Sequence, residues 1–536
     1  MLAFERIREI ERQREMPVDA ISLEVFKNLF AAAAEEMGVT LRRASFSPNI
    51  RERLDFSCAV FDAEARMIAQ AAHIPVHLGS MPASVASAVA EFEEFFPGDL
   101  VVLNDPYRGG THLPDITMIS PVFAGGDLAY FVASRAHHAD VGGMTPGSSP
   151  LSTELYQEGI IIPPVKLRLS GWMNDGALAL IVANSRNPAE RLGDLEAQMA
   201  AHRIGEQRLL DMMVEHGVEA TAEHAAALLE YSRRMTTAVI AGIPDGIYRF
   251  RDAMEGDGQA EFEIPICAQI EVRGESMTVD FSGSAPQVLG NVNAVPAIVR
   301  SATWYCVRLM AEEDIPVNHG CFQPVEVITA EGSFLNPRFP AAVVVGNTET
   351  SQRVVDTVLG ALAQALPEVV PAASLGTMNN FTVGGIDGDE QFVYYETLGG
   401  GHGASSRGAG LSGRHCHMTN TLNTPVEALE YSLPMRVRRY HLRAGSGGGG
   451  SHHGGDGIVR EYEMLAPATI TINSERRLRA PYGINGGEAG LCGVNTVIRD
   501  GTAEIVSGKH SAHVEAGDRV IIETPGGGGW GSPHPL

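Results

Sequence analysis

The sequence predicts an α+β fold, a mixed α/β arrangement in which helices and strands do not alternate as regular βαβ units. Helical spacing of apolar residues and strand-like alternation follow one another irregularly before residue 455. After about residue 455, most of the chain has the pattern of strands. We therefore expect an N-terminal α/β part that carries the candidate site, central helical segments and a β-rich C-terminal part.

The length of the chain indicates more than one domain. A chain of 536 residues is too long for one simple core, because domains usually contain about 100–200 residues. We expect closely packed domains rather than separated ones. The changes in pattern predict an N-terminal α/β domain (1–245), a central mixed α/β domain (246–455) and a β-rich C-terminal segment (456–536).

The N-terminal domain is expected to begin with a long helix. Residues 19–45 place apolar side chains at helical spacing around an Ala-rich middle. Residues 55–70 alternate on both sides of the turn-like sequence DAEA, which predicts a hairpin. In chain order, the pattern then predicts a helix (78–95), a short buried strand (97–105), a strand (127–140) and two helices (187–217 and 221–242).

The rest of the chain changes from mixed to β-rich. Residues 262–288 have the pattern strand, turn, strand. Helical spacing returns at 295–311 and at 353–366. Strand patterns then dominate residues 457–477 and 503–526, and we find no internal repeat.

The composition excludes several classes of protein. A net charge of −25 repels phosphate, so we expect neither nucleic acid nor an anionic membrane as a partner. Six cysteines are scattered without a C-x-x-C pair, which is typical of reduced thiols in a cytoplasmic protein. The N-terminal MLAFERIREIERQRE has no apolar core, so we expect no signal peptide. No stretch of about 18 apolar residues predicts a membrane span.

The stretch LNDPYRGGTHLPDI, residues 103–116, combines residue types that form rigid polar sites. Its glycine pair allows a tight turn, and Pro114 favours extended backbone just before it. His112 and Asp115 should therefore lie in a stiff loop that follows a strand. Side chains three residues apart in such a loop can point at one spot.

A second polar cluster, ASRAHHAD, ends the next predicted strand with His137, His138 and Asp140. If the two strands are neighbours, their C-terminal ends bring the loop and this cluster together. The candidate metal ligands are then His112, Asp115 and His137. Two imidazoles and one carboxylate suit Zn, Mn or Fe and leave positions for water and substrate. The alternative is that these histidines are hydrogen-bonded structural residues beside a turn.

Other patterns are less informative. Asp55 is either a fourth metal ligand or, more commonly for such an acid, a cap or turn residue. The HCH sequence at 415–417 has no second Cys pair nearby, which argues against zinc. The Gly-rich runs 444–457 and 524–531 lack G-K-[ST] and are more typical of loop packing than of phosphate sites. Without a Walker A or Rossmann fingerprint, the chain shows no ATP or NAD site of its own.

Six blocks, spread in one order over residues 20–531, carry a resemblance to a known family. They are ERLDFSCAVFD, NDPYRGGTHLPDITMISPVF, ASRAHHADVGG, GNTETSQRVVDTVLGAL, HMTNTLNTPVEALE and ETPGGGGWG. Together they resemble the hydantoinase B/oxoprolinase family over nearly the whole chain. Six long blocks in order are far more specific than any one of them.

This resemblance implies one half of an ATP-dependent enzyme. The other half, a hydantoinase A-type subunit, would bind ATP and Mg and phosphorylate the substrate, in line with the missing nucleotide motif. The family's divalent-metal site would fall on His112, Asp115 and His137, with Asp55 as a further ligand. His138 or Asp140 would act as general base or would orient the ligands.

The expected function is that of the B-type component of a cyclic-amide hydrolase of the hydantoinase, 5-oxoprolinase or lactamase type, in a hetero-oligomer such as A2B2. The alternative is a component of an ATP-dependent ketone carboxylase of the acetone or acetophenone type. A non-haem Fe(II) oxygenase and a non-catalytic scaffold for the A-type partner are further alternatives. The chain departs from the family at His453, where relatives usually carry Arg, and in the less acidic stretch 403–413. Both departures leave the substrate open.

Overall fold

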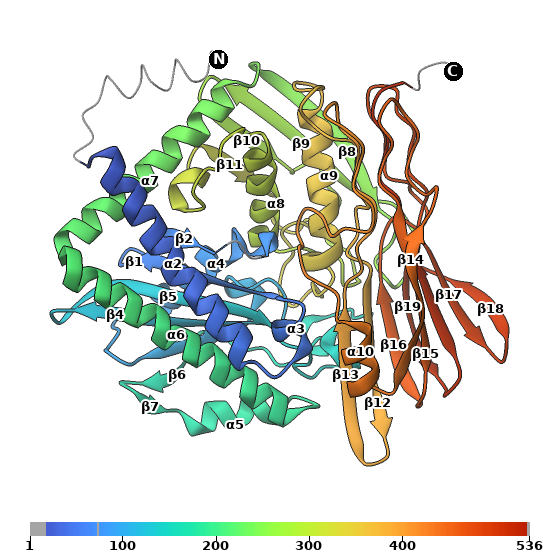
Figure 1. Ribbon diagram of the computed structural model, residues 1–536, viewed down its shortest axis with the longest axis horizontal. Coiled ribbons are helices and arrows are strands. Elements are labelled where there is room, and N and C mark those ends of the chain that lie inside the picture. The colour runs from blue at the N-terminus through green and yellow to red at the C-terminus, as the bar shows by residue number, and fades with distance from the viewer. Residues whose placement is uncertain (1–17, 72–73, 533–536) are drawn as a thin grey trace.

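A seven-stranded antiparallel sheet forms the base of the N-terminal part (Figure 1). The computed structural model describes residues 18–71 and 74–532. The strands lie in the order β2 (Met67–Gln70), β1 (Phe56–Asp62), β5 (Asp127–His137), β4 (Asp115–Ala124), β3 (Leu100–Leu103), β6 (Val165–Leu169) and β7 (Trp172–Met173). The strands β1 to β3 and most of β4 and β5 are buried, as their nearly continuous apolar runs require.

Helices cover both faces of this sheet. The long helices α2 (Ala20–Ala44) and α6 (Pro188–His216) pack together on one face, and α7 (Val218–Ala241) lies beside α2 (Figure 1). Helix α4 (Ser80–Glu91) joins a separate apolar cluster on the other face. Alternate residues of β1 belong to these two clusters, because side chains of a strand alternate between faces. Two short helices complete this part, α3 (Pro48–Arg51) and α5 (Asp175–Ala183).

A four-stranded sheet and two helices form the centre of the molecule. Its order is β11 (Val325–Ile328), β10 (Ser276–Asp280), β9 (Ile264–Arg273) and β8 (Gly246–Met254). Helix α8 (Pro296–Leu309) packs on α9 (Ser351–Leu362), which also contacts β8 and β9 (Figure 1). Every residue of α9 is buried. One apolar cluster runs from β3 and β4 through these helices to β9, so the N-terminal and central parts share a core.

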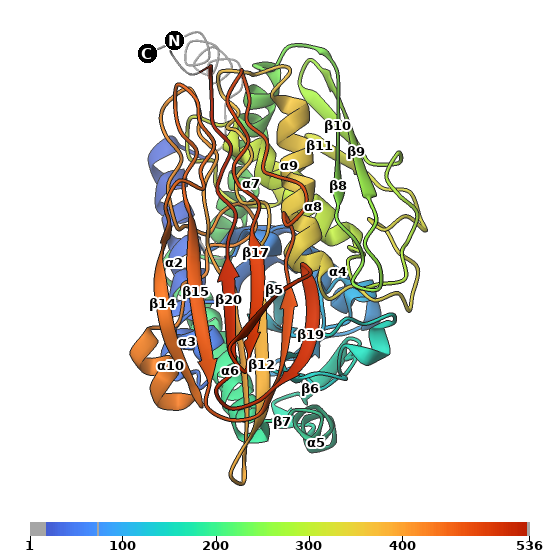
Figure 2. The same cartoon turned by 90° about the vertical axis from the view of Figure 1, so that its right-hand side faces the viewer.

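Two further sheets form the C-terminal part (Figure 2). The first contains β13 (Glu390–Glu396), β12 (Asn380–Asp387), β16 (Ala468–Asn473) and β19 (Lys509–Val514). The second contains β14 (Met435–Arg443), β15 (Gly457–Met464), β20 (Arg519–Glu523), β17 (Val494–Arg499) and β18 (Thr502–Val506). Apolar residues of both sheets and of helix α10 (Val426–Ser432) share one cluster. Each sheet joins strands from both sides of residue 455, and the three-domain division stays a prediction.

The Gly-rich segments pack as extended chains beyond the ends of these sheets (Figure 2). The N–H of Gly448 donates to the carbonyl of Gly527, whose own N–H donates to the carbonyl of Gly455. A Cβ atom on Gly455 would lie 2.0 Å from the carbonyl oxygen of Leu411. Only glycine permits backbones to approach so closely. No helix follows either run in the described chain, so loop packing rather than phosphate binding accounts for their composition.

The structure confirms most predicted elements and adds a strand that the sequence analysis did not predict. β1 and β2 form the hairpin expected in residues 55–70, and the predicted helices correspond to α2, α4, α6, α7, α8 and α9. The sequence analysis left open whether the strand at 97–105 neighbours the strand at 127–140, and the structure places β4 between β3 and β5. The sequence analysis missed β4, since the loop pattern runs directly into it and Pro121 interrupts its apolar run.

Membrane segments were expected to be absent. Over residues 18–71 and 74–532, the structure contains no helix with the length and apolar character needed to cross a membrane. The expectation that the chain starts without a signal peptide concerns residues 1–15, which lie outside the described residues.

Candidate metal centre

The antiparallel pairing of β4 with β5 brings the predicted metal ligands together. Asp115, the first residue of β4, lies directly opposite His137, the last residue of β5. His112 lies three residues before Asp115, in the loop that connects β3 to β4. Strands β3 and β5 both run antiparallel to β4, so their C-terminal ends lie at the same edge of the sheet. The juxtaposition predicted from the sequence is therefore present, with β4 as the connecting strand.

The loop before His112 is held by backbone geometry and by one asparagine. Gly109 has φ +94°, and a Cβ atom there would lie 2.4 Å from the carbonyl oxygen of Ala83. The side chain of Asn104 donates to the carbonyl of Leu113 at 2.7 Å and accepts from the N–H of Ile162 at 2.7 Å. A short turn and a buried amide bridge thus fix the loop, as a preorganised site requires.

Three side-chain atoms converge at this edge of the sheet. His112 Nε2 lies 3.0 Å from Asp115 Oδ1 and 3.1 Å from His137 Nδ1, and His137 Nδ1 lies 3.1 Å from Asp115 Oδ1. All three residues are buried. Ligand atoms about 2 Å from a common divalent ion have separations of this order. Among the described residues, the ligand atoms of these three side chains lie close enough together to bind one ion.

The protonation of His112 suits a metal ligand. Its Nδ1 lies 3.1 Å from the carbonyl oxygen of Val344 and can donate a proton there, which leaves Nε2 with a lone pair toward the cluster. Burial disfavours the charged imidazole, but the adjacent Asp115 carboxylate outweighs burial and raises the pKa of His112. Burial also opposes ionisation of Asp115, yet the three surrounding histidines hold the pKa of its carboxyl well below its usual range. A cation would take the place of the proton that these groups share.

The second oxygen of Asp115 is held by two residues that the sequence analysis did not identify. Thr111 Oγ1 donates to Asp115 Oδ2 at 2.5 Å, and His77 Nε2 lies 3.4 Å from the same oxygen. The other ring nitrogen of His77 is 2.8 Å from Ser57 Oγ. These contacts leave Oδ1 for the cluster, the arrangement by which outer residues orient a metal-binding carboxylate. His77 comes from a separate segment, and no local pattern indicates its role.

A small cavity of about 10 Å³ adjoins the three converging atoms. Such a volume accommodates one ion or one water molecule. Asp55 lies in its wall together with His112 and His137, so the predicted fourth ligand faces the same space. Asn347 and Thr348, from the π-helical turn Gly346–Thr350, also line it. Irregular turns of this kind are common at functional sites.

The ring of Tyr395 forms another part of this wall. It stacks on His137, with centroids 4.5 Å apart and an angle of 24° between the planes. The Tyr395 hydroxyl donates to Asn380 Oδ1 at 2.8 Å. The guanidinium of the buried Arg53 lies 4.8 Å from the centroid of the Tyr395 ring. These contacts fix the plane of the His137 ring. Tyr395 was not a predicted site residue, because it lies far away in the sequence on β13.

The two predicted catalytic residues, His138 and Asp140, do not line this cavity. His138 Nε2 lies 3.0 Å from Gln198 Oε1 on α6, because consecutive residues of an extended chain point to opposite faces. Asp140 pairs with Arg186 at 2.8 Å and also accepts backbone N–H groups of Gly142, Gly147 and Arg186. Their two predicted roles, general base or orienting residue, stay a prediction.

Almost the full length of this chain is similar to known proteins. The family model for hydantoinase B/oxoprolinase matches residues 19–533. 5-Oxoprolinase 1 of Arabidopsis thaliana is 41% identical over 97% of this chain, which spans only 42% of that protein. A protein of Pseudomonas sp. (strain NS671), named as the B component of a D-/L-hydantoinase, is 30% identical, with 96% of this chain and 90% of that protein covered.

Two solved structures have the same fold. The ATP-dependent caprolactamase from Pseudomonas jessenii superposes with a TM-score of 0.90 at 30% identity, covering 97% of this chain and 93% of that one. A nucleotide-free acetone carboxylase superposes with a TM-score of 0.87 at 17% identity, covering 95% of this chain and 76% of that one. At that identity the second match establishes the fold alone.

Proposed function

The chain belongs to the hydantoinase B/oxoprolinase family, and we propose that it is the ring-opening component of an ATP-dependent cyclic-amide hydrolase. The observation that carries the proposal is the convergence of His112 Nε2, Asp115 Oδ1 and His137 Nδ1 beside a buried cavity. The caprolactamase, named as ATP-dependent, supports the reaction class. The relative named as the B component of a D-/L-hydantoinase, 90% of which is covered by this chain, supports a partner that supplies the remaining functions.

The cluster fits a divalent ion such as Zn, Mn or Fe. His112, Asp115 and His137 would hold it, and Asp55 in the cavity wall would be the further ligand. When bound, such an ion polarises carbonyl or phosphoryl oxygens and lowers the pKa of a coordinated water. The buried, preorganised donor set supports this assignment better than a purely structural role for the three residues.

The surrounding residues keep the donor atoms in position. Val344 accepts the Nδ1 proton of His112, so the lone pair of Nε2 stays directed at the cluster. His77 and Thr111 hold the outer oxygen of Asp115. Tyr395 stacks on His137 and fixes its ring plane. His138 and Asp140 act as positioning residues, through Gln198 on α6 and through the loop after β5.

The small cavity sets a requirement for the substrate. A space of about 10 Å³ admits an ion or a water, so a ring can reach the site only when wall residues such as Met378 and Thr348 move. A hydantoinase A-type partner would bind ATP and Mg and phosphorylate the ring carbonyl oxygen, in a hetero-oligomer such as A2B2. Water then adds to the activated carbon here, the amide C–N bond breaks and a proton reaches the nitrogen. A second water hydrolyses the resulting acyl phosphate to the carboxylate and inorganic phosphate.

The test of this function uses the chain co-expressed with its A-type partner. The pair is supplied with ATP and with hydantoin, 5-oxoproline, a lactam or an aryl ketone, with and without bicarbonate. Ring opening without bicarbonate is the expected result. Product formation that requires bicarbonate would instead establish the alternative, a ketone carboxylase. The acetone carboxylase has the same fold.

A further inference from the structure

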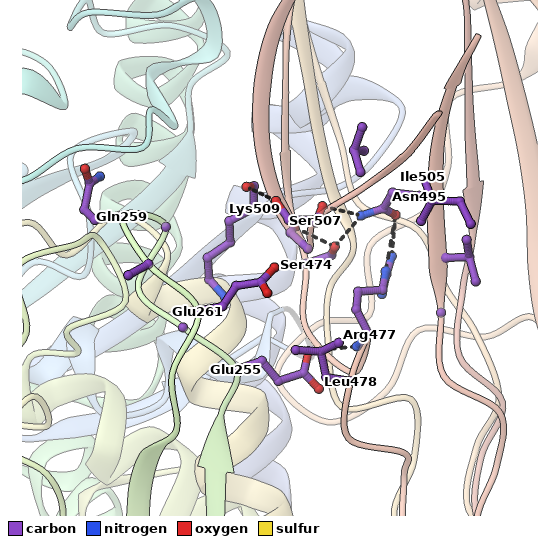
Figure 3. Close-up of a pocket in the computed structure, with 17 residues that line it drawn as sticks. Glu255, Gln259, Glu261, Ser474, Arg477, Leu478, Asn495, Ile505, Ser507 and Lys509 are labelled. Atoms are coloured by element: carbon purple, nitrogen blue, oxygen red, sulfur yellow. Dashed lines mark hydrogen bonds between the residues drawn. The ribbon is translucent and has the colours of Figure 1, made fainter. Parts of the chain in front are cut away.

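A pocket of about 450 Å³ lies between the central sheet and the C-terminal sheets (Figure 3). One wall is the chain after β8, residues 255–261, and the opposite wall consists of three segments of the C-terminal part, 474–478, 493–495 and 505–509. None of the residues of this pocket lines the cavity at the metal centre. Its volume and its position between structural units are typical of small-molecule sites.

Arg477 brings a positive charge to this pocket without a carboxylate partner. Its guanidinium donates to Asn495 Oδ1 at 2.8 Å, to Asn379 Oδ1 at 2.9 Å and to the carbonyl oxygen of Glu475 at 2.7 Å. All three acceptors are neutral, and among the residues that the structure describes no Asp or Glu forms an ion pair with it. Burial lowers the pKa of the Arg477 guanidinium to about 10. The Arg477 side chain is half-buried, and a guanidinium beside a pocket whose direct hydrogen-bond acceptors are all neutral favours an anionic ligand.

Lys509 adds a second cationic group from the same side of the pocket. Its ammonium contacts the Glu475 carboxylate, and its side chain is only 6% exposed. An ammonium has three N–H donors, and this contact uses one of them. Figure 3 shows the Lys509 side chain extending between the two walls. Together, Lys509 and Arg477 offer donors to a carboxylate.

The opposite wall carries negative charge. Glu261 is exposed, and no hydrogen bond or ion pair to its carboxylate occurs among the described residues. Glu255 accepts only backbone N–H groups, from Arg477 at 2.8 Å and from Arg479 at 2.6 Å. Neither carboxylate is neutralised by a basic side chain in contact with it. This wall therefore offers acceptors to an ammonium group.

We propose that this pocket binds the zwitterion of a small amino acid, with its carboxylate at Arg477 and Lys509 and its ammonium at Glu261. The proposed function supplies the link to catalysis, because hydrolysis of a lactam C–N bond yields one carboxylate and one amine. The ligand would then be the ring-opened product or a free amino acid of the same chemistry. Both ligands carry one carboxylate and one ammonium group, which the two walls of the pocket would bind.

The test is calorimetric titration of the full chain without ATP or partner. 6-Aminohexanoate and L-glutamate are the zwitterionic probes, and hexanoate and hexylamine each carry one of the two charged groups. We expect saturable binding of at least one zwitterion, at least about tenfold tighter than either single-charge compound. 6-Aminohexanoate and L-glutamate differ in length, so their ratio indicates whether a lactam product or a free α-amino acid fits better.

Variants locate the binding in the pocket. Glu261→Gln should weaken zwitterion binding about tenfold and leave hexanoate binding unchanged. Glu313→Gln, which removes the same charge from another exposed position, should have no effect. The proposal is overturned if neither zwitterion binds, if hexanoate binds equally well, or if Glu261→Gln binds like the unaltered chain. His112→Ala should bind the zwitterion normally, so failure of the ring-opening function and failure of this pocket are separate outcomes.

Discussion

Asp115 and His137 are direct partners across the β4–β5 pair, and their side-chain atoms Oδ1 and Nδ1 lie 3.1 Å apart. The first residue of one strand and the last residue of the next therefore define the centre. His112 joins them from the preceding loop, with its Nε2 3.0 Å from the same oxygen. The sheet register, rather than a flexible loop, sets the spacing of the candidate ligands.

Removal of one imidazole should abolish tight metal binding. His112→Ala leaves only two of the three converging atoms, so the affinity for Zn²⁺ or Mn²⁺ should fall by about 100-fold or more. Calorimetric titration of the metal-free chain and elemental analysis of the purified protein measure this change. His513→Ala, at a side chain that is 62% exposed, is the matched control and should retain the full affinity. Equal metal content in both variants would contradict the assignment.

His77 should affect the metal through Asp115. Replacement of His77 by Ala frees the outer oxygen of the carboxylate, and loss of such an orienting contact lowers metal affinity by about 10–100-fold. His77→Gln keeps a donor near that oxygen and should lose less. Titration with Zn²⁺ measures both effects, and circular dichroism confirms that each variant is folded. An unchanged affinity in folded His77→Ala would show that His77 does not orient the ligand.

The buried carboxyl of Glu349 should make stability depend on pH. Burial raises its pKa to about 7 in the folded chain, above the ordinary value of 4.5. The folded state thus holds the proton more strongly, so this stabilisation is complete below pH 4.5 and is lost as pH rises through 7. Between pH 5 and pH 8 the loss amounts to about 2–3 kcal/mol.

Glu349→Gln removes this titration and keeps an oxygen acceptor for the Met378 N–H. Its stability should change less than that of the unaltered chain between pH 5 and pH 8. Denaturant unfolding at both pH values measures the difference. Parallel losses of stability in the two proteins would mean that Glu349 does not titrate in this range.

The Gly-rich layer should not tolerate a single methyl group at its tightest contacts. Gly455→Ala places a Cβ atom 2.0 Å from the Leu411 carbonyl oxygen, and overpacking of this kind destabilises by about 1–3 kcal/mol. Gly408→Ala meets no atom within 4 Å and is the matched control. Thermal unfolding should show a lower midpoint for the first variant only. Similar midpoints would indicate that the segments can move apart.

Local patterns predicted the long helices, the hairpin and the polar residues at strand ends. The amphipathic spacing of residues 19–45 and the alternation of 55–70 are properties of single segments, and both elements are present. The pairing of β5 with β4 depends on contacts between segments, and the sequence analysis did not predict β4. The strands β12 to β14 were also missed; β12 pairs with β16 and β14 with β15, which both lie after residue 455.

The candidate site, too, was predicted only as far as local sequence patterns allow. His112, Asp115 and His137 could be chosen because their residue types suit a metal, and because the first two follow one predicted strand and the third lies near the end of another. The sequence analysis assigned both His137 and His138 to the site. Consecutive side chains of an extended chain point to opposite sides, so only one of the two can face it. His77 and Tyr395 come from segments distant in sequence, so only the fold brings them to the centre.

The most direct test measures two products of the same reaction. The complex of this chain with its A-type partner is supplied with ATP and its cyclic-amide substrate, and both ADP and ring-opened product are quantified. His112→Ala should abolish ring opening while substrate-dependent ADP formation by the partner continues, because phosphorylation does not use this centre. Ring opening at the unaltered rate by a folded His112→Ala complex would contradict the account.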